Sequence, residues 1–225
     1  MRVSTIAERL EAVRLRIAGA CLRGGRSPED VTLVAVVKGF PPEAIREAVA
    51  AGVRHLGENR VQEADARRPD LNDPPLDVVW HMVGHLQTNK VATALNLFDI
   101  IQSVDSLHLA QTISRRAHTN VPVFLEVNVA GEATKYGFAP EDLPAAAEAI
   151  ARLPHIEVRG LMTVAPLLGD QQQARPVFRR LRELGRALGL RELSMGMTDD
   201  FEVAVEEGAT VVRIGRAIFG ERSGP

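Results

Sequence analysis

The sequence predicts an α/β fold, a single closed (β/α)8 TIM-type barrel with an extra N-terminal helix. Three observations lead to this prediction. Short runs of apolar and β-branched residues alternate with helical patterns along the 225 residues. Eight such strands can be counted, which is the number in a closed (β/α)8 barrel. The turn after the first strand, at 38–41, lacks the G-x-G-x-x-G spacing typical of a doubly wound open sheet.

Hydrophobic periodicity places the elements in chain order. An amphipathic helix is predicted over 4–23, with a capping box formed by Thr5 and Glu8 and a stop at Gly24. We expect this segment, within residues 1–25, to pack on one barrel domain spanning 1–225. β-branched and apolar runs predict strands at 31–37, 53–56, 78–82, 100–103, 121–127, 156–161, 192–194 and 210–214. Helices are predicted at 42–51, 60–67, 86–97, 107–118, 143–152, 174–188 and 200–207.

Glycine and proline mark several boundaries of these elements. Gly52 is expected to close the helix that starts at Pro42. Prolines 69, 74 and 75 predict a surface loop after the helix over 60–67. Pro122 lies at the start of the fifth strand, where a missing N–H is tolerated.

Composition excludes several classes of function. Lysine and arginine number 27 and aspartate and glutamate 29, so a net charge of −2 gives no general attraction for nucleic acid or acidic membranes. No run approaches the ~20 apolar residues of a spanning helix, and the first residues lack an apolar signal-peptide core. Cys21 is the single cysteine, which excludes an internal disulfide and fits a reducing compartment. We therefore expect a cytoplasmic protein.

The first strand ends in a lysine, Lys38, after the apolar run VTLVAVV. Burying an ammonium group is costly unless it is paired or neutralised. A desolvated lysine loses its proton more easily, and the neutral amine can attack an aldehyde to form a Schiff base. In a barrel of this kind the chemistry is located at the carboxyl ends of the strands. The alternative is that Lys38 extends from the strand end into solvent.

Loops after the seventh and eighth strands are the usual phosphate-holding position in such barrels. Thr198 supplies a hydroxyl there, and the amides of Gly215 and Arg216 follow the eighth strand. The carboxylates at 199–200 would repel a phosphate unless they point away. A phosphate cradle opposite a Schiff-base lysine describes a pyridoxal 5′-phosphate (PLP) site.

Arg213 lies two residues before Gly215 and so on the same face of the strand. If it faces the pyridine nitrogen of the cofactor, its charge keeps that nitrogen unprotonated, which weakens the ring as an electron sink. The alternative is an ion pair within the barrel mouth, with Glu126 as the partner.

Eight segments, in order over nearly the whole chain, carry a family resemblance. They are LVAVVKGFP around Lys38, HLGENRVQE at 55–63, WHMVGHLQTNK at 80–90, IQSVDS at 101–106, EVNVAGEATKYGF at 126–138, GLMTVAP at 160–166, LSMGMTDDFEVAV at 193–205 and GATVVRIGRAIFG at 208–220. The chain resembles the pyridoxal phosphate homeostasis protein family, whose fold is similar to the barrel domain of bacterial alanine racemase.

This resemblance implies site residues by position. Lys38 would hold PLP as an internal aldimine, and Asn59 would lie near the ring hydroxyl. Arg213 would meet the ring nitrogen and Met195 would lie near the ring. The phosphate would be held by three residues, Thr198, Gly215 and Arg216.

The chain departs from the usual family pattern at a few positions. Val37 and Gly39 flank the lysine where Ser and Thr are common, Arg60 replaces a Tyr, and Thr198 replaces a Ser. The changes at 37 and 39 remove hydroxyls from the surroundings of the lysine.

The resemblance favours a carrier protein over an enzyme. It implies a protein that holds PLP, limits the free aldehyde and passes the cofactor to apo-enzymes that need PLP, without catalytic residues of its own. The alternative is a PLP-dependent racemase-like enzyme; a third is a Schiff-base aldolase without cofactor. In alanine racemase a second base, a tyrosine, comes from a separate C-terminal domain of the partner subunit, whereas this chain ends at Pro225. We therefore expect no racemase turnover, and a monomer.

Two other groups of residues carry weaker signals. His81 and His85 flank Gly84, but no Cys or carboxylate at ligand spacing supports a metal site, so we expect His81 to be hydrogen-bonded at a strand end. Lys135 and Tyr136 belong to a polar loop, where we expect the tyrosine to be solvated rather than catalytic.

Overall fold

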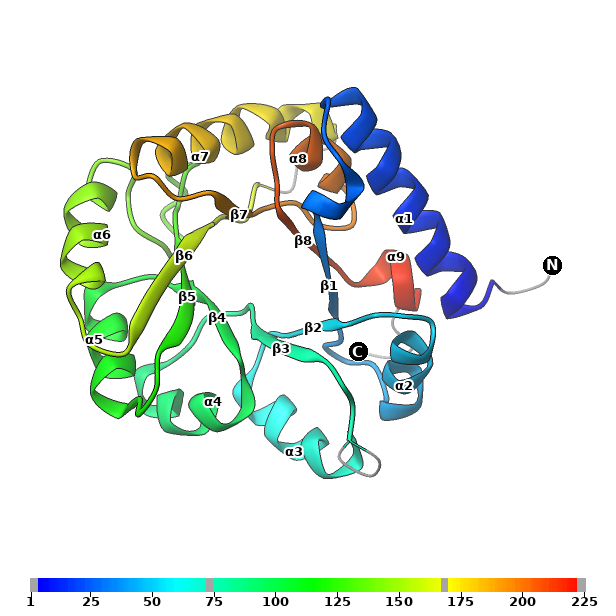
Figure 1. The fold of residues 1–225 in the computed structure, drawn as a ribbon, viewed down its shortest axis with the longest axis horizontal. Helices are drawn as coiled ribbons and strands as arrows, with labels where there is room; N and C mark the ends of the chain where they lie inside the picture. Colours follow the sequence, from blue (N-terminus) through cyan, green and yellow to red (C-terminus); the bar gives the residue numbers. More distant parts are fainter. Residues whose placement is uncertain (1–3, 72–74, 167–169, 222–225) are drawn as a thin grey trace.

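The computed structural model describes residues 4–71, 75–166 and 170–221. Eight parallel strands close into a barrel in the order β1-β2-β3-β4-β5-β6-β7-β8, and helices form a ring around it (Figure 1). The α/β barrel with an added N-terminal helix is therefore confirmed. Among the described residues no helix is long and apolar enough to cross a membrane.

The strands lie close to their predicted positions. They are β1 (Thr32–Val36), β2 (His55–Glu58), β3 (Val79–Met82), β4 (Ile100–Val104), β5 (Val121–Glu126), β6 (Ile156–Met162), β7 (Glu192–Ser194) and β8 (Val211–Ile214). The second strand differs most, because it begins two residues later than the apolar pattern from Val53 suggests and extends into the Gly57-Glu58 segment. Its pairing with β3 requires this register, with His55 opposite Val79 and Glu58 opposite Met82.

Nine α-helices lie within the described residues. They are α1 (Ile6–Arg23), α2 (Pro42–Ala50), α3 (Val61–Leu71), α4 (Val91–Leu97), α5 (Leu107–Arg116), α6 (Leu143–Ala151), α7 (Arg175–Ala187), α8 (Phe201–Glu206) and α9 (Arg216–Phe219). Short 3-10 turns η1 (Pro28–Asp30), η2 (Thr88–Lys90) and η3 (Gln171–Ala174) precede β1, α4 and α7. The predicted capping box at the start of α1 is present, with Glu8 N–H donating to the Thr5 hydroxyl at 3.2 Å.

Three helix predictions need correction. The helix expected from residue 86 begins as α4 at Val91, because Gln87 is extended and a 3-10 turn follows it. Helix α3 continues past residue 67 to Leu71 with Pro69 inside it, since Leu71 is buried in the core. Two other prolines were predicted in this loop. Pro74 lies outside the described residues, and Pro75, the next residue, is described and forms an isolated β-bridge. The short helix α9, which directly follows β8, was not predicted.

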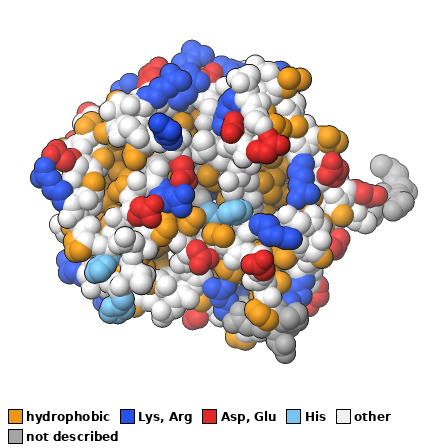
Figure 2. Space-filling model, viewed as in Figure 1, with side chains coloured by type: hydrophobic (Ala, Val, Ile, Leu, Met, Phe, Trp, Pro, Cys, Tyr) orange, Lys and Arg blue, Asp and Glu red, His pale blue; other side chains and the backbone are white. Residues whose placement is uncertain are grey.

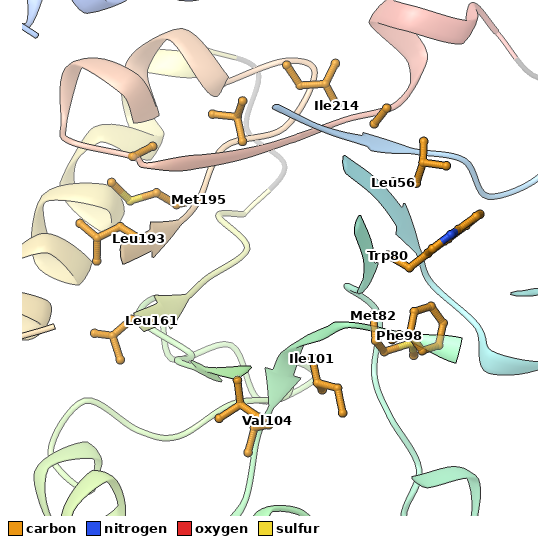
Figure 3. Close-up of a cluster of buried hydrophobic side chains, with 14 of the residues drawn as sticks. Leu56, Trp80, Met82, Phe98, Ile101, Val104, Leu161, Leu193, Met195 and Ile214 are labelled. Carbon is orange, nitrogen blue, oxygen red and sulfur yellow. The ribbon is translucent and has the colours of Figure 1, made fainter. Parts of the chain in front are cut away.

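Most buried apolar side chains lie between the strands and the surrounding helices. Figure 3 shows them projecting outward from the strands; Leu56, Met82, Ile101, Leu161, Leu193 and Ile214 are examples. A much smaller apolar cluster is made by Val34, Phe124, Met162 and Val211. Burying a large aliphatic side chain stabilises a fold by roughly 1.5–3 kcal/mol, so the outer layer holds most of the stabilisation.

Helix α1 covers the part of the barrel where the first and last elements meet. It lies against α2, α8 and α9 (Figure 1), and its buried residues belong to the same apolar cluster as those of the barrel. Arginines of α1 and α7 pair with glutamates of α8, as in Arg16–Glu202 at 2.8 Å and Arg175–Glu206 at 2.5 Å. Charges of both signs are interspersed over the outer helices in Figure 2. Ion pairs between exposed charges contribute little each to the stability of a fold.

Two leucines of α1 allow a test of this packing. Leu10 is 1% exposed and Leu15 is 65% exposed. Leu10→Ala should lower the free energy of unfolding by about 2–5 kcal/mol, because it leaves a cavity against the barrel. Leu15→Ala should change it by less than about 0.5 kcal/mol. Urea unfolding measures both values, and equal losses in the two variants would contradict the packing of α1.

Candidate functional site

A cavity of about 360 Å³ opens at the carboxyl ends of the strands, where β1 and β8 meet. Its volume falls in the range of small-molecule pockets. Six of the seven site residues named from the sequence line it. The lining consists of Val36, Lys38, Phe40, Asn59, Val83, Val164, Met197, Thr198, Asp199, Arg213, Gly215 and Arg216.

Strand alternation brings Lys38 and Gly215 to the cavity. Successive side chains of a strand point to opposite faces, so residues two apart share a face. In β1 that face holds Val34 and Val36 and continues to Lys38, which is partly buried. The pairing of β1 with β8 places Val34 beside Arg213. The two chain segments that supply the amine and the glycine turn are therefore neighbours at the barrel mouth.

Asn59 reaches the cavity because the backbone after β3 packs closely on it. A Cβ atom at Gly84 would lie 2.3 Å from the Asn59 carbonyl oxygen, a distance that no side chain tolerates. Glycine at 84 therefore lets the loop after β3 contact the loop after β2. Asn59 also lines a second hollow of about 620 Å³ next to the cavity.

The two aspartates after Thr198 are neutralised or directed elsewhere. Asp199 forms an ion pair with Arg216. Asp200 accepts a hydrogen bond from the Met197 N–H at 2.6 Å, which turns its carboxylate toward its own backbone. Burial raises the pKa of Asp200, and that hydrogen bond opposes the shift. These contacts reduce the repulsion between a bound anion and the carboxylates at 199–200 that the sequence predicts.

Arg213 is buried, with 4% of its surface exposed. Its Nη1 donates to the Ser194 hydroxyl at 2.6 Å and its Nη2 to the Thr163 carbonyl at 2.8 Å. Burial lowers the pKa of Arg213 to about 10, and the charges of Glu126 and Asp200 oppose this shift. The guanidinium therefore remains charged at neutral pH. Within the described chain it makes no ion pair with Glu126, the alternative raised by the sequence, although the two charges attract.

Met195 is placed away from the cavity. It is fully buried, and Figure 3 shows it with Leu193 on the outward side of the barrel wall, facing the helices. Met197, two residues further along, lines the cavity instead. The motif SMGM offers two methionines of the same parity, so strand alternation alone could not choose between them.

The structure also places the residues that depart from the family pattern. Val37 is fully buried in the outer apolar cluster and so faces away from the cavity. Arg60 has 75% of its side chain exposed, pairs with Glu63 and does not line the cavity. Thr198 does line it.

Several lining residues were not identified from the sequence. Phe40 lies on the cavity side of the turn after Lys38 and stacks on Phe219 with ring centroids 4.7 Å apart. Val83 and Val164 follow β3 and β6. Their position just beyond a strand end was the available signal, but apolar residues there carry no chemical signature.

The rings of His81 and Tyr136 each lie against the ring of another histidine. His81 lies within β3 and is hydrogen-bonded, as predicted, through both of its ring nitrogens. No group of metal-ligating side chains occurs in the part of the chain that the structure describes. Tyr136 is 56% exposed, and its ring stacks on that of His85 with centroids 3.7 Å apart.

Comparison with known proteins identifies the family. The family described as alanine racemase, N-terminal domain, matches residues 11–223. A pyridoxal phosphate homeostasis protein of Pseudomonas aeruginosa is 48% identical over 225 residues, covering 98% of this chain and 97% of that protein. The chain belongs to the pyridoxal phosphate homeostasis protein family. A further family member, from Aquifex aeolicus, is 47% identical over 224 residues, covering 96% of this chain and 97% of that protein.

Solved structures agree with membership of the pyridoxal phosphate homeostasis protein family. PipY of Synechococcus elongatus, solved with PLP bound, is 40% identical with a TM-score of 0.83, covering 96% of this chain and 100% of PipY. Alanine racemase of Corynebacterium glutamicum is 19% identical with a TM-score of 0.67, covering 96% of this chain and 62% of the racemase. The second likeness concerns the fold alone.

The carboxyl group of Glu126 provides a pH test of the barrel mouth. Burial, and then the Asp105 carboxylate, raise its pKa from 4.5 to about 7, while Arg213 opposes the shift. At pH values between 4.5 and about 7, the Glu126 carboxyl is protonated in the folded protein and ionised in the unfolded chain. The free energy of unfolding therefore falls as the pH rises through this range. Glu126→Gln should remove up to about 3 kcal/mol of that fall.

Urea unfolding across that pH range, for wild type and variant, measures the difference. Glu141→Gln, a change at an exposed carboxylate, serves as the control and should leave the pH profile as in wild type. A Glu126→Gln profile that parallels that of wild type would show that the Glu126 pKa is not raised.

Proposed function

We propose that this chain binds PLP in the cavity between β1 and β8, through a Schiff base at Lys38, and acts in PLP homeostasis. One observation carries the proposal: a single cavity is lined by an amine, a buried guanidinium and a glycine turn with a threonine hydroxyl. PLP consists of an aldehyde, a pyridine ring and a phosphate, and each of these groups has a chemical counterpart in that lining.

The phosphate end of the cofactor suits the side of the cavity made by Thr198, Gly215 and Arg216. The first amides of a helix have no acceptor within it, and α9 begins at Arg216 directly after Gly215. Arg216 adds a positive charge, which Asp199 partly offsets. The ring then lies between this end and Lys38, with Arg213 at its nitrogen and Asn59 at its hydroxyl.

The fixed charge of Arg213 favours a carrier over an enzyme. A guanidinium beside the pyridine nitrogen opposes protonation of that nitrogen, because two cations repel. An unprotonated ring withdraws electrons weakly, which suits storage of the aldehyde better than carbanion chemistry. Partial exposure of Lys38, Thr198 and Arg216 leaves the cofactor within reach of solvent. We infer that the protein releases PLP to apo-enzymes that require it and works without turnover of its own, in the cytoplasm and as a monomer.

Covalent trapping tests the role of Lys38. The sequence contains three lysines, Lys38, Lys90 and Lys135, so borohydride reduction after loading with PLP leaves few possible products. Peptide mapping should find the reduced cofactor on Lys38, and Lys38→Ala should lose the visible absorbance of the loaded protein.

Lys90→Ala and Lys135→Ala are the matched controls and should keep that absorbance. A Lys38→Ala protein that folds, as judged by circular dichroism, and still shows the wild-type band would exclude the proposed attachment.

The size of residue 215 tests the phosphate end. Gly215 lines the cavity, and a Cβ at this position would lie 3.2 Å from the Val36 carbonyl oxygen, while the backbone φ of −112° is not in the left-handed region that favours glycine. Gly215→Ala and Gly215→Val should weaken PLP retention in that order, with at least about a tenfold rise in Kd for valine. Equilibrium dialysis gives the Kd values, and an unchanged Kd for both variants would exclude Gly215 from the phosphate site.

A further inference from the structure

A chain of hydrogen bonds crosses the interior of the barrel, beginning at Arg213 on β8. Arg213 Nη1 and the Ser194 hydroxyl on β7 are 2.6 Å apart. The Ser194 hydroxyl and Gln102 Oε1 on β4 are also 2.6 Å apart. Gln102 Nε2 lies 2.8 Å from His81 Nδ1 on β3, and His81 Nε2 lies 3.0 Å from His55 Nδ1 on β2. Five strands on both sides of the barrel are thus connected by polar side chains.

Four of these five residues are buried, and the fifth, His55, is partly exposed. Ser194 and Gln102 are fully buried, and His81 is 2% exposed. A buried polar atom that loses its partner costs about 1–3 kcal/mol, so the arrangement of the chain is strongly constrained. The interior of a barrel is usually filled by layers of apolar side chains. Three buried polar residues in this interior therefore need a physical explanation.

Arg213 determines which atom donates in each hydrogen bond of this chain. A guanidinium has no acceptor, so Ser194 must accept from Arg213 and can give its one proton to Gln102 Oε1. The Gln102 amide then donates to His81 Nδ1. The proton of a neutral His81 must lie on Nε2, where it donates to His55 Nδ1. The opposite orientation of the Gln102 amide would place its N–H against a hydroxyl that already accepts from Arg213 and leave the Ser194 proton without an acceptor.

The surroundings keep both histidines neutral, as this arrangement requires. Burial, followed by the charges of His55 and Arg159, lowers the pKa of His81 to about 3. Burial also lowers the pKa of His55. Neutral rings can accept at one nitrogen and donate from the other, which protonated rings cannot do.

We propose that Ser194, Gln102 and His81 are positioning residues that hold the Arg213 guanidinium in one orientation toward the cofactor cavity. The Thr163 carbonyl holds Nη2 from the other side, at 2.8 Å. With both terminal nitrogens fixed, the guanidinium plane cannot rotate as the ligand enters or leaves. The inference rests on the proposed function in one respect: it takes the ligand at Arg213 to be PLP.

The tautomer of His81 can be measured without any cofactor. The sequence has six histidines, and 15N-histidine labelling of the apo protein resolves the two ring nitrogens of each by NMR. The His81 signals are identified by their loss in His81→Gln. At neutral pH His81 should be the Nε2–H tautomer in wild type, and Gln102→Met should convert it to a mixture. An Nδ1–H tautomer in wild type would overturn the inference.

A pair of serines gives a matched test of the Arg213 end. Ser194 and Ser103 are both fully buried, but the Ser103 hydroxyl has no hydrogen bond to any described residue. Ser194→Ala should raise the Kd for PLP about five- to tenfold and shift the pH dependence of the visible absorbance of the loaded protein. Ser103→Ala should leave the Kd and the pH dependence of the absorbance unchanged. Ser194→Thr, which keeps the hydroxyl, should give the wild-type Kd and the wild-type pH dependence.

The outcomes separate this inference from the proposed function. Equal effects of Ser194→Ala and Ser103→Ala would overturn the positioning role while leaving PLP binding at Lys38 intact. If His81 has the predicted tautomer but PLP is attached elsewhere than Lys38, the positioning of Arg213 is supported. The proposed attachment at Lys38 is then excluded.

Discussion

The parallel pairing of β1 with β8 is the constraint on which the site depends. It joins the first strand to the last, places Thr32 beside Val211 and Val34 beside Arg213, and closes the barrel. Because side chains alternate along each strand, this register decides which residues meet inside the mouth. A shift of one residue in β8 would turn Arg213 toward the helices and bring an apolar neighbour into the cavity. Helices α1 and α9 pack together over the same junction, so the closure is supported from outside as well.

The barrel interior differs from its exterior in a way that relates to function. The outer layer between strands and helices is apolar and provides stability (Figure 3). Inside, a small apolar cluster around Phe124 is accompanied by the polar chain from Arg213 to His55. A buried cation is tolerated only where its hydrogen bonds are made, and Ser194 and Thr163 supply them. The stability of the fold and the placement of charge at the site are thus assigned to opposite faces of the same strands.

Sequence reasoning recovered the fold because its signals are local. Each strand of apolar residues is bounded by glycine, proline or a polar cap, and the alternation with helices is regular. It selected Lys38 and Gly215, which line the cavity in the structure, because a lysine or a glycine at a strand end is chemically conspicuous. It misplaced the start of β2, since Val53 and His55 fit a strand pattern equally well and only the pairing with β3 selects between them. The orientations of Met195 and Gln102 could not be predicted from the sequence, because the alternation of side chains along a strand does not show which face points to the barrel axis.

The central claim is that one cavity holds the amine and the phosphate cradle for a single PLP molecule. A crystal structure of the protein grown with PLP tests it most directly. The account predicts continuous density from Lys38 Nζ to a pyridine ring beside Arg213, with the phosphate against Thr198, Gly215 and Arg216. Density joined to Lys90 or Lys135, or a phosphate bound away from the turn after β8, would contradict it.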